Sequence, residues 1–574
     1  MDAITGGVSR RAFLKAGATL GGGIVAAGMP LSQAIWAAEG KVLEGRSNFL
    51  RKLDPAFYSS QGDVDVMNCI YSKLTRYKPG SEWGWDLEAA EKIEQVDPTH
   101  IRFRLKKGIK FTGGYGEMTA KDVKFSFERV MKLDGSAKLD WGSFDHVELE
   151  NDYTGVIVFK NPYVPAWLLA LPYGGGHILS EDAVVRLIPR GGDFGMKPPA
   201  FSGPYVLADW KPDQYTLLTR NPDWSGPKPG FDEIRLLPIS DDKAAERAYQ
   251  AGDVDFTSIS LDSLARFKST PPADTKVEEK PSIGYTWLGL NIDNPKLKDI
   301  NVRKAIQWAI NVPQILDAAY SGQVNVATGT IAPAIVGHRA KAIVPPEGDL
   351  MKAKEFLEKA GVSDLRLTLD CSNDSLTTNI AQMVQAQLSH IGITVEVNAL
   401  DDSTFWTIGM ESEGERWKEV QLILNHYIGL PDPHYQVESF TQDQVGVWNW
   451  ERFRSERFDE VVAKAITIED PVARAKLYYE AQDLMEESGA YRFLTNGAMP
   501  IMSRNTQIVD AATRPDGAPL YLDFKPPLSL LVLFPKPMGP RGRHNRHRGG
   551  ASVPDDSCRA RRSGRGFAWP PRHA

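Results

Sequence analysis

The stretch IRFRLKKGIKFTGGYGEMTAKDVKFSFERVM, residues 101–131, decides the fold. It opens with apolar and charged residues alternating from Ile101 to Leu105, which is the period-two pattern of a half-buried strand. A glycine pair then predicts a turn. Thr119 and Asp122 have the spacing of a capping box at a helix N-terminus, and apolar residues recur on one helical face after them. The stretch therefore predicts a strand, a turn and an amphipathic helix.

Length and composition further limit the possible fold class, partners and location of the protein. The chain has 574 residues, so more than one compact unit is expected. It is 42% hydrophobic and 24% charged, which is typical of a soluble globular protein. A net charge of −6 gives no reason to expect a nucleic-acid partner. Because no segment contains twenty strongly apolar residues, no membrane-spanning helix is expected in the mature chain.

The three cysteines, Cys69, Cys371 and Cys558, lie far apart and lack the spacing of metal ligands. We expect Cys69 and Cys371 to be free buried thiols, although a disulfide between them is the alternative in an exported protein. No metal site and no cofactor is predicted.

The N-terminus predicts export. Residues 9–15 read SRRAFLK, which matches the twin-arginine export motif, and a stretch rich in glycine and alanine follows. Cleavage after Ala34 or after Ala37 fits the small residues there. We therefore interpret residues 1–37 as a signal peptide and expect the mature protein in the periplasm.

Several stretches resemble the family 5 extracytoplasmic solute-binding proteins of ABC importers, which include dipeptide-, oligopeptide- and nickel-binding types. The resemblance begins with FRLKKGIKF and TAKDVKFSFERV in the opening stretch and extends over residues 42–523. It is also carried by LDPAFYSSQGDVDVMNCIYSKLTRY at 53–77, by residues 201–256 with GPY, RNP and GDVD, and by INVRKAIQWAINVPQILDAAY at 300–320.

The resemblance implies an α/β, two-lobed fold like that of periplasmic binding proteins, of type II, with an extra small domain and hinge strands between the lobes. Lobe I would be discontinuous and comprise residues 38–70, 195–284 and 491–523. The extra α+β domain would be residues 71–194, and lobe II residues 285–490.

The last part of the chain differs in composition. Residues 524–574 are dense in Arg, Gly, His and Pro, so they have too little apolar surface to offset chain entropy. We predict a disordered basic tail. A change of reading frame near Phe524 is our hypothesis for its origin.

The implied function is a transport receptor that closes around a small or peptide-like solute and delivers it to ABC permease subunits in the membrane. Such a receptor makes and breaks no bond, so no catalytic residue and no enzymatic activity is expected, and a monomer is expected. An exported hydrolase is a less favoured alternative, because the chain lacks the His-Glu-x-x-His, Gly-x-Ser-x-Gly and P-loop motifs. A chaperone-like binder of the same fold is another.

Two positions bear on the ligand. In peptide-binding relatives an acidic residue holds the amino terminus of the peptide, and its position aligns with Gly429. A basic residue that meets the carboxylate in dipeptide binders corresponds to Thr378 and Asn379. The anchoring charges are therefore either missing or moved, with Asp432 three residues after Gly429, and a non-peptide ligand (a saccharide, a polyamine or another cation) is an alternative.

The candidate ligand-binding residues share an aromatic or acidic character and a place near the implied cleft. Aromatic faces suit sugars, cations and apolar groups. His426 and His434 flank the acidic candidate but are not expected to hold a metal. The candidates are Asp432, Tyr427, Trp406, Trp448, Trp450, Tyr285 and Trp287.

Overall fold

The computed structural model describes residues 41–47, 50–133 and 135–527. The predicted signal peptide, residues 1–37, and the chain from residue 528 onward lie outside the described residues. None of the described helices combines the length and the apolar character that crossing a membrane requires.

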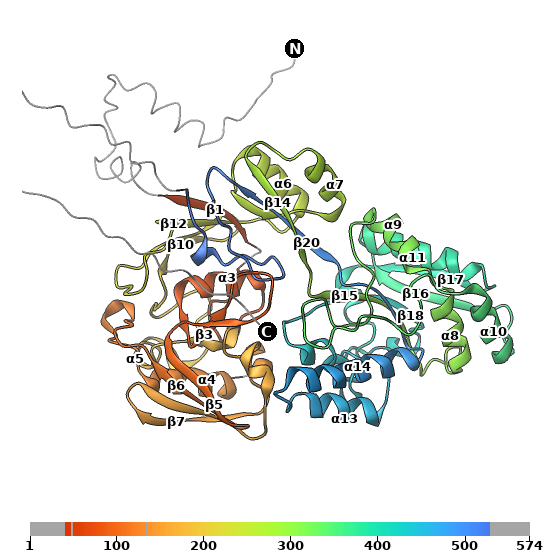
Figure 1. Cartoon of the computed structure of the whole chain (residues 1–574), viewed down its shortest axis with the longest axis horizontal. Helices are drawn as coiled ribbons and strands as arrows, with labels where there is room; N and C mark the ends of the chain where they lie inside the picture. Colours follow the sequence, from red (N-terminus) through yellow and green to blue (C-terminus); the bar gives the residue numbers. More distant parts are fainter. Residues whose placement is uncertain (1–40, 48–49, 134, 528–574) are drawn as a thin grey trace, which may run out of the picture. The chain divides into compact units, whose positions relative to one another are not determined.

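Lobe I is built on a four-stranded sheet of order β1-β12-β11-β10 (Figure 1). Strand β1 runs parallel to β12, and the other neighbours are antiparallel. Helix α3 begins after Ser60, whose hydroxyl accepts a hydrogen bond from the backbone N–H of Asp63. The bounds are β1 (Val42–Ser47), α3 (Gln61–Ile70), β10 (Tyr205–Lys211), β11 (Tyr215–Arg220) and β12 (Glu233–Pro238).

The opening stretch forms the elements predicted for it. Strand β6 (His100–Leu105) lies in an antiparallel sheet of order β5-β6-β8-β7, and helix α4 (Ala120–Lys132) follows it. The capping box is confirmed, because Asp122 Oδ2 accepts from the Thr119 N–H at 2.8 Å. The bounds of the other elements in this region are β2 (Ser72–Lys73), β3 (Thr75–Tyr77), β4 (Trp85–Leu87), β5 (Ala90–Asp97), β7 (Phe144–Asn151), β8 (Thr154–Phe159), β9 (His177–Ile178) and α5 (Glu181–Leu187).

This region, the extra domain of residues 71–194, has its own apolar core around Phe103, Phe127 and Trp141. It also contributes Tyr77 and Tyr173 to the core of lobe I. The apolar core of lobe I therefore extends across the boundary predicted at residue 70 into the extra domain.

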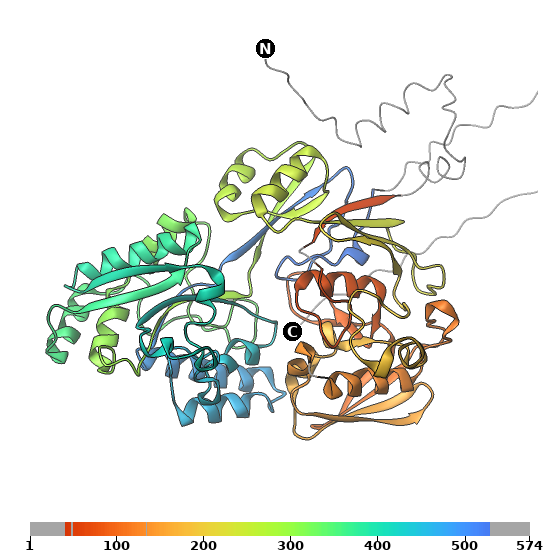
Figure 2. The same ribbon diagram turned by 180° about the vertical axis from the view of Figure 1, so that it is seen from behind.

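Lobe II contains a five-stranded sheet of order β17-β16-β18-β15-β19 with helices on two faces. Leu288 and Leu290 of β15 face helices α8 to α11, whereas Trp287 packs on the side of α13 and α14, as the alternation of side chains along a strand requires. Figure 2 shows α13 and α14, in blue, side by side. The bounds are β15 (Gly284–Leu290), α8 (Ile300–Ala309), α9 (Val312–Tyr320), α10 (Leu350–Ala360), β16 (Arg366–Ser372), α11 (Ser375–Ser389), β17 (Thr394–Leu400), α12 (Asp402–Phe405), β18 (Leu422–Ile428), α13 (Glu456–Ala465), α14 (Pro471–Glu487) and β19 (Tyr491–Thr495).

Two short connections join lobe I to lobe II. They lead out of a three-stranded sheet of order β13-β20-β14, in which β14 (Thr275–Pro281) pairs with β20 (Ala498–Arg504). The chain passes from β14 into β15 through residues 282–283, and returns from β19 to β20 through residues 496–497. The other elements of this part are α6 (Asp242–Ala251), β13 (Phe256–Ser258) and α7 (Leu261–Ser269).

The structure differs from two of the predicted boundaries. Strand β19 pairs with β15, so the sheet of lobe II continues to Thr495, beyond the predicted end at residue 490. Phe524, predicted to begin the disordered tail, is buried against Phe256 and Tyr521, and the backbone of Lys525 pairs with Asp510. Phe524 therefore belongs to the packed part of the chain, because burial of its aromatic side chain is favourable whatever the average composition of the residues around it.

Cys69 and Cys371 are buried and unpaired, as expected. Burial raises the pKa of the Cys371 thiol to about 11, so this thiol stays protonated at neutral pH.

Candidate functional site

A cavity of about 1170 Å³ is lined by residues of lobe I, the extra domain and lobe II. Its volume suits a small ligand, since binding pockets typically measure about 300–1,000 Å³. Ser59 comes from the segment before α3 and Leu139 from the extra domain. The lobe II residues come from β15, from the residue after α12, from the C-terminal end of β18 and the loop after it, and from α13 and the residue that follows it. They include Tyr285, Trp406, His426, Tyr427, Ile428, His434, Tyr435, Glu438, Asp443, Trp448, Asp459 and Ile466.

The direction of the strands explains this location. Strands β16, β17 and β18 are parallel, so their carboxyl ends share one edge of the sheet, where loops are free to contact a ligand. His426 and Tyr427 lie at that end of β18, and Tyr285 of β15 is the cross-strand partner of Tyr427.

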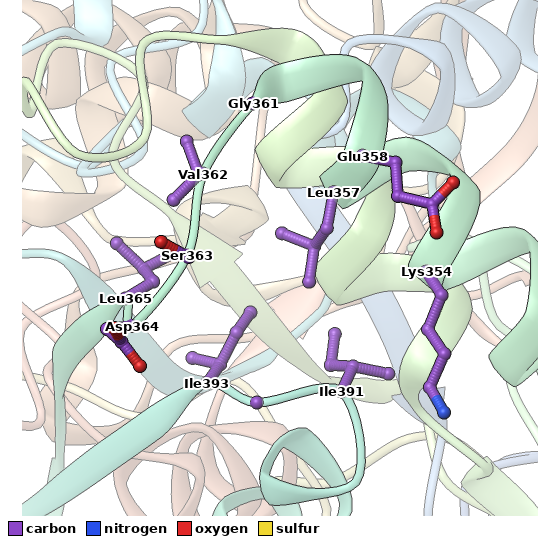
Figure 3. Close-up of a pocket in the computed structure, with 11 residues that line it drawn as sticks. Lys354, Leu357, Glu358, Gly361, Val362, Ser363, Asp364, Leu365, Ile391 and Ile393 are labelled. Carbon is purple, nitrogen blue, oxygen red and sulfur yellow. The ribbon is translucent and has the colours of Figure 1, made fainter.

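A second cavity, of about 490 Å³, lies at the opposite end of these strands. Leu357 of α10 and the isoleucines Ile391 and Ile393 line it, and Lys354 and Glu358 lie at its side (Figure 3). It is next to the residues that precede β16 and β17, and it receives no residue from lobe I. The large cavity is therefore the better candidate site.

Three of the predicted aromatic residues form one wall of the large cavity, which we call the aromatic box: Trp406, Tyr427 and Trp448. The rings of Trp406 and Tyr427 are 6.2 Å apart and nearly parallel, whereas Trp448 meets Tyr427 edge-on at 6.1 Å. The Tyr427 hydroxyl donates to the Trp448 carbonyl oxygen at 3.0 Å, which fixes the ring. Trp448 remains 40% exposed.

Three further predicted aromatic residues support this wall. Tyr285 contributes to the lining although it is only 3% exposed. Trp287 and Trp450 are buried outside the lining. Trp287 packs against Tyr427 at 4.9 Å and donates its Nε1–H to Glu451 Oε1, and Trp450 packs against Trp406 at 6.1 Å.

Asp432, the acidic candidate, is 1% exposed and lies outside the lining. Both of its carboxylate oxygens accept hydrogen bonds from Arg474 of α14, at 2.8 Å each. Oδ1 also accepts from the backbone N–H of His434. In this structure Asp432 ties the loop after β18 to α14.

The structure shows what surrounds Gly429, Thr378 and Asn379, the positions at which peptide-binding relatives carry their anchoring charges. A Cβ atom at Gly429 would lie 2.6 Å from both Gln436 Nε2 and the Ile283 carbonyl oxygen, so an acidic side chain has no room there. Thr378 lies in the first turn of α11, where its hydroxyl donates to the Asp374 carbonyl oxygen, and neither Thr378 nor Asn379 lines the cavity.

The cavity instead has acidic residues that the sequence did not single out. Glu438, Asp443 and Asp459 line it, and among the described residues neither a Lys nor an Arg does so. Glu438 lies 3.0 Å from His434 Nε2, and Asp459 accepts from the Gln442 side chain at 2.8 Å. No pattern of spacing marks these carboxylates, because Glu438 and Asp443 come from the segment after β18 whereas Asp459 comes from α13.

Asp140, a further carboxylate, lies in the extra domain and outside the lining. It is 4% exposed, and its Oδ2 accepts from the Tyr58 hydroxyl at 2.7 Å. Burial raises the pKa of Asp140 to about 7, and the negative charge of Glu438 contributes in the same direction. Glu438 of lobe II therefore acts electrostatically on the extra domain.

No group of three or more His, Cys, Asp or Glu side chains is placed to hold a metal ion within the described ranges. His426 is near the aromatic box, its ring 5.9 Å from Trp406.

Comparison with known proteins matches residues 87–446 to the model of the bacterial extracellular solute-binding proteins, family 5. The chain is 26% identical to the "Probable D,D-dipeptide-binding periplasmic protein" of Escherichia coli K12, over 82% of this chain and 91% of that one. It is 25% identical to the nickel-binding periplasmic protein of the same organism, over 79% and 88% of the two chains.

Solved structures show the same fold. The periplasmic binding protein DppA of Helicobacter pylori, in complex with the peptide STSA, matches with a TM-score of 0.69 at 23% identity, over 86% of this chain and 99% of that one. This likeness confirms the predicted two-lobed α/β fold. The family match covers more than half of the chain, and with the inter-lobe cavity it leads to one conclusion: the protein belongs to family 5 of the bacterial extracellular solute-binding proteins of ABC transporters.

Proposed function

We propose that this protein is the periplasmic receptor of an ABC importer, which encloses a small solute between its lobes and delivers it to a membrane permease. The observation that carries the proposal is the large cavity, because residues of both lobes line it and, within the described part of the chain, two short connections join those lobes. The twin-arginine motif at residues 9–15 supports export as part of the same proposal.

Closure of the lobes is the step that binding has to drive. Hinge closure around a ligand is the known motion of periplasmic binding proteins. In this structure the Val164 N–H of the extra domain donates to the Ile466 carbonyl oxygen of lobe II at 2.9 Å, and the Ile466 side chain packs against the core of the extra domain. A solute in the cavity stabilises this closed arrangement by its differential affinity for it.

The residues at the cavity supply contacts and no chemistry. Solute would be held by the aromatic box and the carboxylates, and released unchanged when the lobes open. The relatives bind different ligands, since one is named for D,D-dipeptides and another for nickel. A peptide-like solute follows from these relatives, whereas the missing anchoring charges favour a ligand held in another way.

The test uses the mature protein and a panel of peptides, saccharides and amines. One solute class should raise the thermal unfolding temperature and reduce the radius of gyration measured by X-ray scattering, while chromatography recovers the solute intact. Turnover of a bound solute, or unfolding and scattering profiles that no solute changes, would refute the receptor function.

A further inference from the structure

The large cavity is lined by acidic side chains and, among the described residues, by no Lys or Arg. Glu438, Asp443 and Asp459 contribute three carboxylates, and the two histidines in the lining are the other titratable groups besides tyrosines. Arg474 of α14 donates two hydrogen bonds to Asp432 and a third to the Ala465 carbonyl oxygen, and it does not line the cavity. A ligand carboxylate would therefore meet no Lys or Arg among the described lining residues, and its burial there would be unfavourable.

Closure brings the carboxylates of lobe II opposite the extra domain, because Glu438 and Leu139 line the same cavity. Asp140, next to Leu139 in the chain, is buried outside the lining, and burial is the main cause that raises its pKa to about 7, with the charge of Glu438 a smaller contribution in the same direction. Like charges on opposite sides of a cleft oppose its closure, whereas a positive charge between them favours it. A cationic ligand would thus bind the closed form better than the open form, which is what a receptor of this kind requires.

Besides the carboxylates, the aromatic box supplies the second kind of contact that a cation-binding site uses. Trp406, Tyr427 and Trp448 present ring faces and edges in a fixed arrangement, held by the Tyr427 hydrogen bond and by the packing of Trp450. Ring faces attract ammonium groups through their quadrupole, more strongly when water is excluded.

We propose that this cavity binds an organic cation that carries no carboxylate, such as an alkylamine, a polyamine or a quaternary ammonium compound. The inference rests on the receptor function proposed above and specifies its ligand class. It assigns the ammonium group to the space between the aromatic box and Glu438, with Asp459 as a further acceptor.

The first experiment compares ligands of different charge, and it includes a free acid and an amide of nearly the same shape. Binding to the mature protein is measured calorimetrically with spermidine, benzyltrimethylammonium, maltose and the dipeptide Ala-Phe beside its C-terminal amide. At least one of the three cations, the amide included, should bind saturably, and the amide should bind at least about tenfold more tightly than the free acid. Equal or tighter binding of the acid, binding of maltose alone, or failure of every cation to bind overturns the proposal.

The second experiment uses matched variants and whichever cation of that panel binds most tightly. Glu438→Gln keeps the size of the side chain and should weaken binding about tenfold or more. Glu355→Gln on α10, which removes an equal charge from an exposed position outside the lining, should leave affinity unchanged. Unchanged affinity in Glu438→Gln contradicts the assignment.

The two proposals fail in different ways. Lobe closure with maltose or free Ala-Phe, detected by X-ray scattering, would refute the proposed cationic ligand but would still support the receptor function. Absence of closure with every class of solute would remove both.

Discussion

Asp432 and Arg474 form a buried ion pair in lobe II, with exposures of 2% and 5% for the two side chains. Burial disfavours the guanidinium charge, but Asp432 outweighs this and raises the pKa of Arg474 above its ordinary value. The pair fixes the loop after β18, which carries His434 and Glu438 into the cavity. Its contribution to the site is therefore positional.

Removing one partner should be costly. Arg474→Met leaves the carboxylate of Asp432 buried without its cation, so the free energy of unfolding should fall by about 3–5 kcal/mol. Urea unfolding of the mature protein measures this.

Arg457→Met is the matched control, because Arg457 of α13 is 55% exposed and pairs with the exposed Glu480. Its loss should be at most about 1 kcal/mol. Equal losses in the two variants would show that the Asp432 pair is not stabilising beyond a surface contact.

Glu451 provides a pH-dependent test at the residue scale. It is fully buried, and burial raises its pKa from 4.5 to about 7, although the hydrogen bond from Trp287 acts in the opposite direction. The folded state therefore holds a proton that the unfolded state has lost between about pH 4.3 and 7, so this group reduces stability as pH rises through that window.

Glu451→Gln keeps an acceptor for Trp287 Nε1 and removes the buried charge. We expect it to raise the free energy of unfolding at pH 8 by on the order of 2 kcal/mol, and to change it little at pH 4. Denaturant unfolding at both pH values checks this. A gain that is the same at pH 4 and pH 8 would rule out the charge as its cause.

At the scale of single elements, the capping of α4 shows how local sequence and tertiary packing combine. Asp122 Oδ2 accepts from the Thr119 N–H, as the local pattern predicts, and Oδ1 accepts from the Glu181 N–H at 3.0 Å. One carboxylate thus caps α4 and positions the start of α5 (Glu181–Leu187).

Asp122→Ala removes both acceptors from an almost buried position, so stability should fall by about 1–3 kcal/mol. Asp122→Asn keeps one carbonyl oxygen and should lose less. Thermal unfolding followed by circular dichroism compares the two variants, and an Asn variant as unstable as the Ala variant would contradict this account.

At the scale of the whole described chain, some apolar side chains of one lobe pack against the core of the other. Trp83 of the extra domain packs against the apolar core of lobe I and against that of lobe II. Leu430, from the loop after β18, packs in turn against the core of lobe I. We expect these contacts to form on closure and so to influence how much of the ligand-free protein is closed.

Trp83→Ala should shift the ligand-free protein toward the open form. X-ray scattering should give a larger radius of gyration, because apolar surface that favours closure is lost. Trp224→Ala is the control, since Trp224 lies in a turn of lobe I and donates its Nε1–H to the nearby Pro227 carbonyl oxygen. A radius of gyration that Trp83→Ala leaves unchanged would show that this contact does not control closure.

The sequence by itself determined the family, the two-lobed α/β fold, the capped helix at Thr119 and the aromatic character around β18, because local periodicity, capping residues and family motifs are written in consecutive residues. Only the tertiary structure decided which aromatic residues line the cavity and which support it. It also decided that Asp432 pairs with Arg474, and that Asp140 is buried and accepts a hydrogen bond from Tyr58. The physical reason is that burial and charge pairing depend on partners far apart in the chain, so the role of a carboxylate is set by what the fold places beside it.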